Sequence, residues 1–405
     1  MTESVIEHVD ILIIGAGPVG MTLHLALAAP FSPLAPTGRG AGGEGLKSLL
    51  LDRRSKDAQQ ADPRALALSH GARQLLEQIN SWPSRAATPI ETIHVSQKDG
   101  FGRTVIDRAD YTLPALGYVV RYRDLAAALA VNLADNAVLS EAEIINTTPG
   151  DEQITVTLRH AGQLRTIQTR LLVHAEGTPG DDPDVKVSDY DQHAVICEVT
   201  PLPTRQADGL RRPAHQNRAW ERFTPDGPLA LLPLGDEYSI VFTLPPAKAD
   251  AVMAMDDATF TAALQQQFGQ RMRFTKPGQR SRYPLALRLR DTLVKGNEVW
   301  IGNTAQTLHP VSGQGFNLGI RDAWQLAENL LKNGVDRNSL ASYAASRKLD
   351  RQGSAFFTDQ IVRAFSNDFG PLKLARGLGL LALDVCPPAR HFVAKRMIWG
   401  ARAWP

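Results

Sequence analysis

Residues 9–14 form a short, almost continuous apolar run rich in branched side chains, which is typical of a strand covered on both faces in a parallel sheet. The segment GAGPVG follows directly, and residues 21–29 then have the pattern of a helix. Residues 48–51 (SLLL) predict a second buried strand, which ends before Asp52. This order predicts a βαβ unit. Residues 30–45 contain too many glycines and prolines for regular structure, so we expect an exposed, mobile loop there.

The remaining pattern predicts a second sheet and a helical end. Apolar periodicity predicts helices at residues 65–79, 123–133, 256–268 and 317–331. Short apolar runs predict a hairpin that returns to the first sheet, at residues 154–158 and 166–175. Strands separated by turn residues predict an antiparallel sheet, from residues 194–199, 219–223, 229–232 and 238–244. A further strand is expected at 299–302, and most residues after 334 are expected to be helical.

Composition narrows the class of protein. The 405 residues carry 44 Lys and Arg against 42 Asp and Glu, a balance that lacks the basic surface of a nucleic-acid binder. Cys197 and Cys386 are too few and too far apart for a disulfide framework or a zinc site, which favours a reducing compartment. The acidic, polar start does not resemble a secretory signal, and the longest apolar candidate, residues 372–385, contains three charges. We therefore expect a cytoplasmic protein without a metal site, whose membrane contact, if any, is peripheral.

The glycines between the first strand and helix have the spacing of a dinucleotide-binding turn. Gly15 permits the tight turn, Gly17 lets a pyrophosphate approach the backbone, and Gly20 lets the helix and strand pack closely. The helix N-terminus supplies amide donors for the phosphates. Asp52, after the next strand, is placed to accept hydrogen bonds from an adenosine ribose. This motif alone does not distinguish NAD from FAD.

A second glycine-rich element lies near the other end of the chain. The segments GNTAQ (302–306) and HPVSGQGFN (309–317) follow a predicted strand and lead into a predicted helix. The backbone amides of Gly315, Phe316 and Asn317 would stabilise negative charge, as a reduced flavin requires. An ordinary capped loop explains the same segment. For His309 a proton shuttle and a structural hydrogen bond are both open.

Several segments together resemble a known enzyme family. They are GAGPVG, Asp62-Pro63-Arg64 before ALALS, Glu176-Gly177-Thr178 after a strand, and GNTAQTLHPVSGQGFNLGIRDAWQLAE. Over most of its length the chain is similar to class A flavoprotein aromatic hydroxylases of the p-hydroxybenzoate hydroxylase fold. Within that group it most resembles the ubiquinone-biosynthesis hydroxylases of the 2-octaprenyl-6-methoxyphenol hydroxylase type, through IHVSQKDGFGR, DYTLPALGYVV, ERFTPDGPLALLP and RSRYPLAL.

The resemblance implies an α/β fold with a Rossmann-like FAD-binding domain, a middle antiparallel-sheet substrate domain and a helical C-terminus. The expected regions are 1–180 for the first part of the FAD domain, with residues 71–100 a candidate contribution to the substrate domain, then 181–283 for the substrate domain, 284–334 for the second part of the FAD domain, and 335–405 for the helical end.

The family also implies roles for individual residues. Gly15, Gly17, Gly20 and Asp52 would hold the ADP half of FAD, Arg64 and Arg123 its phosphates or ring system, and Asn303 its ribityl chain. The segment Gly313, Gln314, Gly315, Phe316 and Asn317 would lie against the isoalloxazine ring, with Pro310 and Gly315 at the catalytic position. In the family, NADH or NADPH reduces FAD, O₂ adds at C4a, and the hydroperoxide transfers one oxygen to an electron-rich phenol, here a polyprenylated one.

Two positions depart from the wider family. Glu176 stands where most members have Asp, in a motif tied to FAD and nicotinamide binding, and Asn303 also replaces an Asp. Asn303 is in keeping with the subgroup that the chain most resembles. Glu176 and the basic C-terminus leave open a catalytically silent flavin-binding subunit of a lipid-biosynthetic assembly, and a flavin-dependent reductase on the same fold is a further alternative. Apolar and cationic residues alternate from Leu372 onward, which suits either a helix packed on its own core or contact with a membrane or a ubiquinone-biosynthesis complex.

Overall fold

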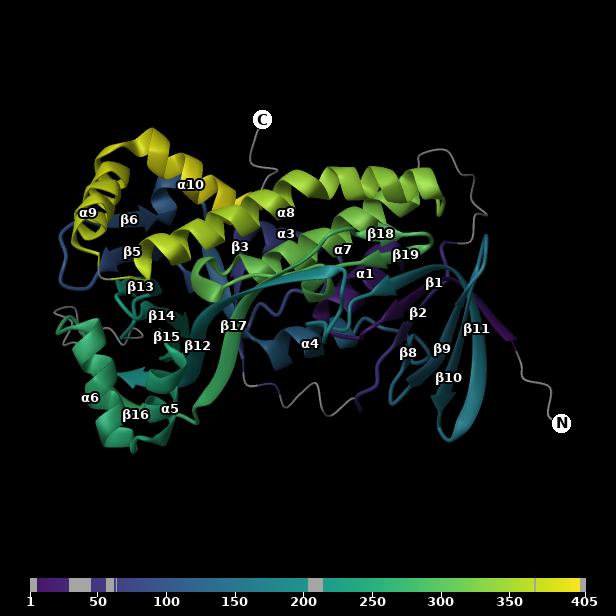
Figure 1. Ribbon diagram of the computed structural model, residues 1–405, viewed down its shortest axis with the longest axis horizontal. Coiled ribbons are helices and arrows are strands. Elements are labelled where there is room, and N and C mark those ends of the chain that lie inside the picture. The colour runs from purple at the N-terminus through teal and green to yellow at the C-terminus, as the bar shows by residue number, and fades with distance from the viewer. Residues whose placement is uncertain are drawn as a thin grey trace.

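The computed structural model describes residues 6–28, 45–55, 62, 64–202, 214–367 and 369–400. The loop expected at residues 30–45 falls outside these ranges except for its last residue. The mixed α/β architecture is confirmed, with two large sheets side by side and long helices covering them (Figure 1).

The first sheet contains the predicted βαβ unit. Its strands, in spatial order, are β18 (Val294–Lys295), β19 (Glu298–Trp300), β11 (Gln163–His174), β1 (Ile6–Ile14), β2 (Ser48–Leu51) and β8 (Val138–Leu139). β1 pairs in parallel with both β11 and β2. β10 (Ile154–His160) adds to β11 as the predicted antiparallel hairpin, and β9 (Glu143–Pro149) adds to β10. Buried aliphatic side chains of β1 pack on both faces, as its continuous apolar sequence predicts.

The second sheet is mainly antiparallel. Its strands, in order, are β20 (Gln306–Thr307), β17 (Ser281–Arg290), β12 (Val185–Pro201), β15 (Glu237–Leu244), β14 (Gly227–Leu234), β13 (Arg218–Thr224), β5 (Thr92–Gln97) and β6 (Arg103–Asp107), with β16 (Phe274–Pro277) beside β12. β5 and β6 thus join it from the N-terminal part of the chain. β17 runs through the boundary expected at 283–284, so residues 284–290 pair within this sheet.

A small sheet corrects one sequence prediction. Residues 65–79 are not one helix, because Ala65–Ser69 form β3 and only His70–Gln78 form the helix α3. β3 pairs with β7 (Gly117–Arg121), which also pairs with β4 (Thr88–Ile90). The alternation ALALS suits a strand with one buried face, and pairing with β7 overrides its helical propensity.

Helices cover the sheets and form the C-terminal region. The others are α1 (Pro18–Ala28), α4 (Tyr122–Ala130), α5 (Pro246–Ala254), α6 (Asp257–Phe268), α7 (Gln314–Asn333), α8 (Arg337–Phe365), α9 (Gly370–Val385) and α10 (Pro387–Trp399), with short 3₁₀ turns η1 (Arg108–Tyr111), η2 (Gly302–Thr304) and η3 (Pro310–Ser312). In Figure 1, α8 extends across the top of the molecule from the first sheet to the second, and α9 and α10 lie beside β5 and β6.

Candidate FAD-binding site

The turn between β1 and α1 accepts only glycine at two positions. Gly15 has φ +102°, and a Cβ there would lie 2.6 Å from the carbonyl of Ala175. A Cβ on Gly20 would lie 2.0 Å from the carbonyl oxygen of Gly15. A Cβ on Gly17 would approach the Tyr122 hydroxyl to 3.3 Å. The backbone of this turn is therefore held close to its neighbours, with Tyr122 beside it.

Asp52 lies under the same turn, as its position after β2 predicts. Its Oδ2 accepts a hydrogen bond from the Ala16 amide at 3.0 Å, and its Oδ1 accepts one from the Arg54 amide at 2.8 Å. The Arg54 guanidinium donates to the carboxylate as well. Burial raises the pKa of Asp52, but these hydrogen bonds and the Arg54 charge outweigh burial and lower the net pKa. Asp52 is therefore an ionised carboxylate, and Arg54 is a partner that the motif did not reveal.

Arg64 packs on Tyr122, the residue beside the glycine turn, and Arg123 follows Tyr122 in α4. Arg64 is paired with Asp62 at 2.6 Å, and its guanidinium carbon lies 5.4 Å from the centroid of the Tyr122 ring. The Tyr122 amide also donates to the Arg64 carbonyl at 2.8 Å. The side chain of Arg123 is 57% exposed on α4, with Asp124 3.8 Å away. Tyr122, the immediate neighbour of Arg123, is thus the residue that contacts the glycine turn.

The second glycine element packs directly on the first. Gly302 has φ +63°, and a Cβ on either Gly302 or Gly319 would lie within 3.2 Å of Val19 in α1. The Gly302 amide donates to Asp322 Oδ2 at 3.1 Å. Asn303, within η2, is partly exposed next to this contact. The start of α7 and the start of α1 therefore meet at Val19.

Asn317 joins the start of α7 to β3. Its Nδ2 donates to the carbonyls of Gly313 at 2.7 Å and Ala67 at 2.9 Å, and its Oδ1 accepts from the Ser69 amide at 2.8 Å. Ala67 is also the nearest contact that a Cβ on Gly313 would make, at 3.3 Å. Gly17 thus lies beside Tyr122, Tyr122 contacts Arg64, and Arg64 leads into β3, which contacts Gly313. These contacts connect the first glycine turn to the second glycine element.

The other residues of this segment differ in their surroundings. Gln314 is buried and donates to the Met397 carbonyl of α10 at 3.1 Å, and Phe316 packs on the main core. A Cβ on Gly315 would meet one atom within 4 Å, Leu308 Cβ at 4.0 Å. Pro310, in η3, is partly exposed beside this segment. The N-cap residue of α7 is Gly313, which has no side chain to cap the first amides of this helix. Such a helix start can bind an anionic ligand.

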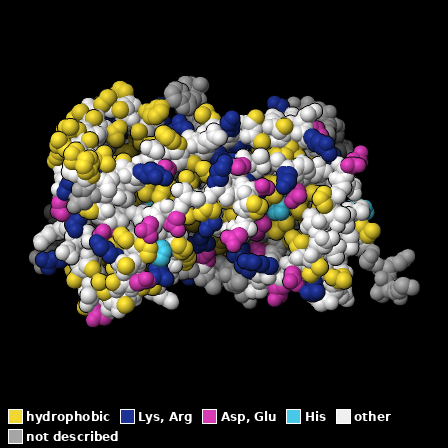
Figure 2. Space-filling model, in the orientation of Figure 1, with side chains coloured by type: hydrophobic (Ala, Val, Ile, Leu, Met, Phe, Trp, Pro, Cys, Tyr) yellow, Lys and Arg dark blue, Asp and Glu magenta, His cyan; other side chains and the backbone are white. Residues whose placement is uncertain are grey.

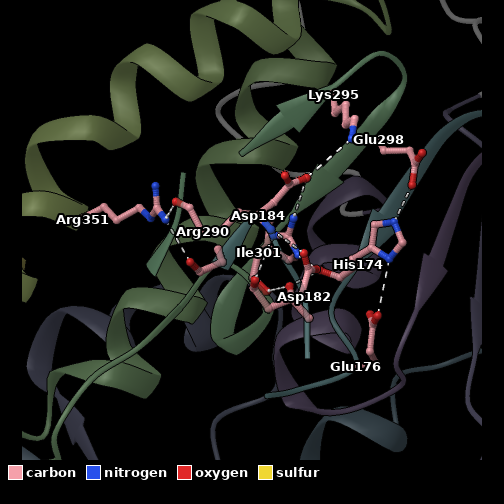
Figure 3. Close-up of polar contacts among 11 residues, drawn as sticks. His174, Glu176, Asp182, Asp184, Arg290, Lys295, Glu298, Ile301 and Arg351 are labelled. Carbon is pink, nitrogen blue, oxygen red and sulfur yellow. Dashed lines mark hydrogen bonds and ion pairs between the residues drawn. The ribbon is translucent and has the colours of Figure 1, made fainter. Parts of the chain in front are cut away.

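His174 connects the end of β11 to the second glycine element (Figure 3). Its carbonyl accepts hydrogen bonds from the Ile301 amide at 3.0 Å and the Thr304 hydroxyl at 2.7 Å. Its ring lies between two carboxylates, with Nε2 2.8 Å from Glu298 and Nδ1 3.4 Å from Glu176. Burial lowers the pKa of His174, but both carboxylates raise it to about 9. A protonated His174 therefore balances Glu176, the departure noted in the sequence.

Three buried arginines hold the start of the second glycine element, η2, in place. Arg290 is paired with Asp182, and its guanidinium carbon lies 4.3 Å from the centroid of the Trp300 ring. Arg351 donates to the carbonyls of Arg290 and Ala305 (Figure 3). Deeper in the core, Arg347 pairs with Asp322, the acceptor of the Gly302 amide. Charges from four separate segments therefore hold η2 in place.

His309 has a structural hydrogen bond. Its Nδ1 accepts from the Val311 amide at 3.1 Å, and burial lowers its pKa to about 3. The ring is therefore neutral at physiological pH, which favours the structural alternative over a proton shuttle.

An apolar cavity opens beside the Gly313–Asn317 segment. Its walls include Ile90, Ile93 and Ile106 from the small and second sheets, Leu116 before β7, and Met397 and Ile398 from α10. Ser312, Gly313, Gln314 and Asn317 form another wall. A ligand in this cavity would contact the predicted flavin-binding segment directly.

The donor set fits FAD: one tight glycine turn with a buried carboxylate, and a second helix start with uncapped amides. A family model described as an FAD binding domain matches residues 8–353. The chain belongs to this FAD-binding family. FAD is therefore its cofactor, as the resemblance predicted.

Two full-length relatives of this FAD-binding protein extend the comparison. An uncharacterized protein of Synechocystis sp. is 31% identical, with 96% of this chain and 92% of the relative covered. Ubiquinone hydroxylase UbiL of Rhodospirillum rubrum is 28% identical, with 100% and 93% covered. The structure of p-nitrophenol 4-monooxygenase PnpA from Pseudomonas putida shares the fold, with a TM-score of 0.71 and 14% identity over 98% of this chain and 100% of that one. The predicted fold class is confirmed. Among the described residues, no helix combines the length and apolar character needed to span a bilayer.

Proposed function

We propose that this FAD-binding protein is an NAD(P)H- and O₂-dependent monooxygenase that hydroxylates a polyprenylated phenol in ubiquinone biosynthesis. The observation that carries the proposal is the packing of two glycine elements on each other with an apolar cavity beside the second, in a chain similar over its full length to a ubiquinone hydroxylase. An apolar wall suits a phenol ring with an aliphatic tail, and it excludes the water that would intercept reactive oxygen.

The proposed roles follow the two elements. Gly15, Gly17, Gly20 and Asp52 hold the ADP half of FAD, with Arg54, Tyr122 and Arg64 close by. Asn303 meets the ribityl chain, and Pro310 with the Gly313–Asn317 segment lies against the isoalloxazine ring. When bound and reduced, FAD supplies the activation of O₂. The uncapped α7 amides stabilise negative charge on the ring, and the cavity orients the phenol.

Labelled oxygen tests the reaction. The purified protein is loaded with FAD and given NADH or NADPH, ¹⁸O₂ and a short-chain prenylphenol. We expect phenol-stimulated oxidation of the nicotinamide and one ¹⁸O atom in the product. A Gly20→Val variant, which is sterically excluded from the tight turn, is the inactive control. Product without ¹⁸O would favour a reductase, and the absence of any phenol-stimulated oxidation would favour a silent subunit.

We also propose that the protein is cytoplasmic and contacts the inner face of the membrane through α9 and α10. Exposed apolar side chains gather there (Figure 2, upper left), and we call them the α9–α10 patch: Phe369, Leu374, Leu378, Leu381, Val385 and Phe392. Lys373 and Lys395 flank this patch, and the opposite face of α10 lines the apolar cavity. A lipid-tailed substrate would then have a short path from the bilayer to the site.

Vesicle binding tests this contact. We expect the protein to sediment with vesicles that contain anionic lipid, more weakly with zwitterionic ones, and Leu378→Glu with Leu381→Glu to abolish sedimentation. Leu349→Glu with Phe356→Glu, which also places two glutamates at exposed apolar positions but in α8 outside the patch, is the control. Equal sedimentation of both variants would contradict a membrane role of the patch.

A further inference from the structure

Glu221 of β13, in the second sheet, is a partly buried glutamate with one enclosed carboxyl oxygen. Its Oε1 is enclosed and accepts no hydrogen bond from the described residues. Burial alone raises the pKa of Glu221 to about 8, with no described charged group contributing. Buried polar atoms in folded proteins are nearly always hydrogen bonded, so an unpaired carboxyl oxygen needs a reason such as a ligand or a catalytic role.

The alternation of β13 shows which way this carboxyl faces. Trp220 packs on Phe268 of α6, on the outer face of the sheet. Ala219 and Phe223, two residues to either side of Glu221, face inward. Ala219 packs with Val119 of β7, and Phe223 stacks on Phe365 of α8 with ring centroids 3.9 Å apart. Because side chains alternate along a strand, Glu221 points toward the FAD-binding side.

The same face forms part of the apolar cavity. Ile93, the partner of Ala219 across the β5–β13 pair, lines the cavity together with Ser312 and Gly313. Val95, next along that face of β5, is the partner of Glu221, and Ala230 of β14 is its partner on the other side. Glu221 is therefore an acidic group within an apolar wall, one step along the strand from the cavity lining.

We propose that the Glu221 carboxylate binds the phenolic hydroxyl group of the substrate and accepts its proton. The phenol O–H bond breaks, the proton joins a carboxylate oxygen, and the bonding electrons remain on the phenolate oxygen. The ring becomes more electron-rich at the carbon that receives oxygen, and this proton transfer needs no oxidant or reductant. The inference rests on the proposed function, because it assumes a phenol as substrate.

The raised pKa gives this role a pH signature. In the free protein most Glu221 is protonated at pH 7, so the carboxylate that accepts the proton becomes abundant only as the pH rises through about 8. The cross-strand neighbours of Glu221 are Val95 of β5 and Ala230 of β14, and Phe365 of α8 stacks on Phe223 on the same face of β13. None of these three side chains titrates, and burial is the one cause that raises the pKa of Glu221.

Equilibrium binding to the oxidised, FAD-loaded protein, with no nicotinamide present, tests the role without turnover. The probes are 2-methoxyphenol and its methyl ether, and the measured quantity is the ratio of their dissociation constants at pH 6.5 and 8.5. We expect the wild type to prefer the phenol about tenfold at pH 8.5 and less at pH 6.5. Glu221→Gln should reduce the preference to a few-fold and remove its pH dependence, and Glu221→Ala should abolish it. Glu143→Gln, at an exposed glutamate of the first sheet, should match the wild type.

The outcomes separate the inference from the function it rests on. FAD binding by each variant shows that it is folded. Variants that keep a pH-dependent preference overturn the role of Glu221. A wild-type protein that binds both probes equally while a phenol stimulates its nicotinamide oxidation also overturns that role and leaves the proposed function standing. A wild-type protein that binds neither probe and shows no prenylphenol-stimulated oxidation of the nicotinamide overturns both.

Discussion

The imidazole of His174 lies flat against the indole of Trp300, with ring centroids 4.7 Å apart and planes 5° from parallel. The stack places a cation between Glu176, next to the first glycine turn, and Glu298, at the start of β19. One ring therefore connects the segment after β11, which lies against the first glycine turn, to β19, the strand that precedes the second glycine element, and its charge balances both carboxylates.

We expect the free energy of unfolding to fall as the pH rises toward 9. The pKa of His174 is about 9 in the folded protein and about 6.5 when unfolded. Because the folded value is the higher one, the stabilisation is complete below about pH 6.5 and is lost as the pH passes through 9. A shift of this size corresponds to at most about 3 kcal/mol. Urea unfolding from pH 6 to 9.5 measures the slope, which Glu298→Gln should flatten and the exposed Glu143→Gln should not. An unchanged slope in Glu298→Gln would contradict this account.

Replacing Asn317 by a charged residue should damage the protein more than removing its side chain. In Asn317→Asp, a carboxylate would face the carbonyls of Gly313 and Ala67 in place of an amide donor. We expect a loss of about 2–3 kcal/mol of stability and weaker FAD binding, with Asn317→Ala less affected than Asn317→Asp. Urea unfolding of the FAD-free protein and titration with FAD measure the two effects. Asn146→Asp, at an exposed amide of β9, is the control. Normal FAD binding by Asn317→Asp would show that the hydrogen bonds of Asn317 do not support the FAD site.

Asp322 should be essential for the position of η2. Its carboxylate accepts from the Gly302 amide, from Gln306 and from Arg347, and its side chain is 1% exposed. Asp322→Asn leaves the Arg347 cation buried with Asp350 as its remaining carboxylate, so we expect a loss of about 3 kcal/mol or more. Thermal unfolding compares this variant with Asp291→Asn, which removes the exposed pair with Lys186 and should cost under about 1 kcal/mol. Similar losses in both variants would show that η2 does not depend on the buried network.

Local pattern predicted the parts of the site that need a particular backbone. Gly15 and Gly20 occupy positions where only glycine fits, and Gly302 has the positive φ that favours glycine. The spacing of these glycines can therefore be recognised in one sequence. Asp52 was found because it follows a buried strand. The sequence did not indicate three further residues of the site, Tyr122, Arg54 and His174. Tyr122 and His174 contact elements that are distant in sequence, and the pair of Arg54 with Asp52 belongs to no recognised motif. The strand β3 was predicted as helix because its partner β7 lies about fifty residues further along the chain.

A substitution at Gly315 should weaken FAD binding without destabilising the fold, in contrast to substitutions at the other glycines of the site. A methyl group there would meet only Leu308 Cβ at 4.0 Å, so Gly315→Ala should leave the FAD-free protein equally stable or up to about 1 kcal/mol more stable. If the isoalloxazine lies against this residue, the same methyl group should weaken FAD binding at least tenfold. Gly379→Ala, in an open position of the helix α9, should show the same stability gain with unchanged FAD affinity. Urea unfolding without FAD and fluorescence titration with FAD measure both quantities, and normal FAD affinity in Gly315→Ala would move the flavin ring away from the α7 N-terminus.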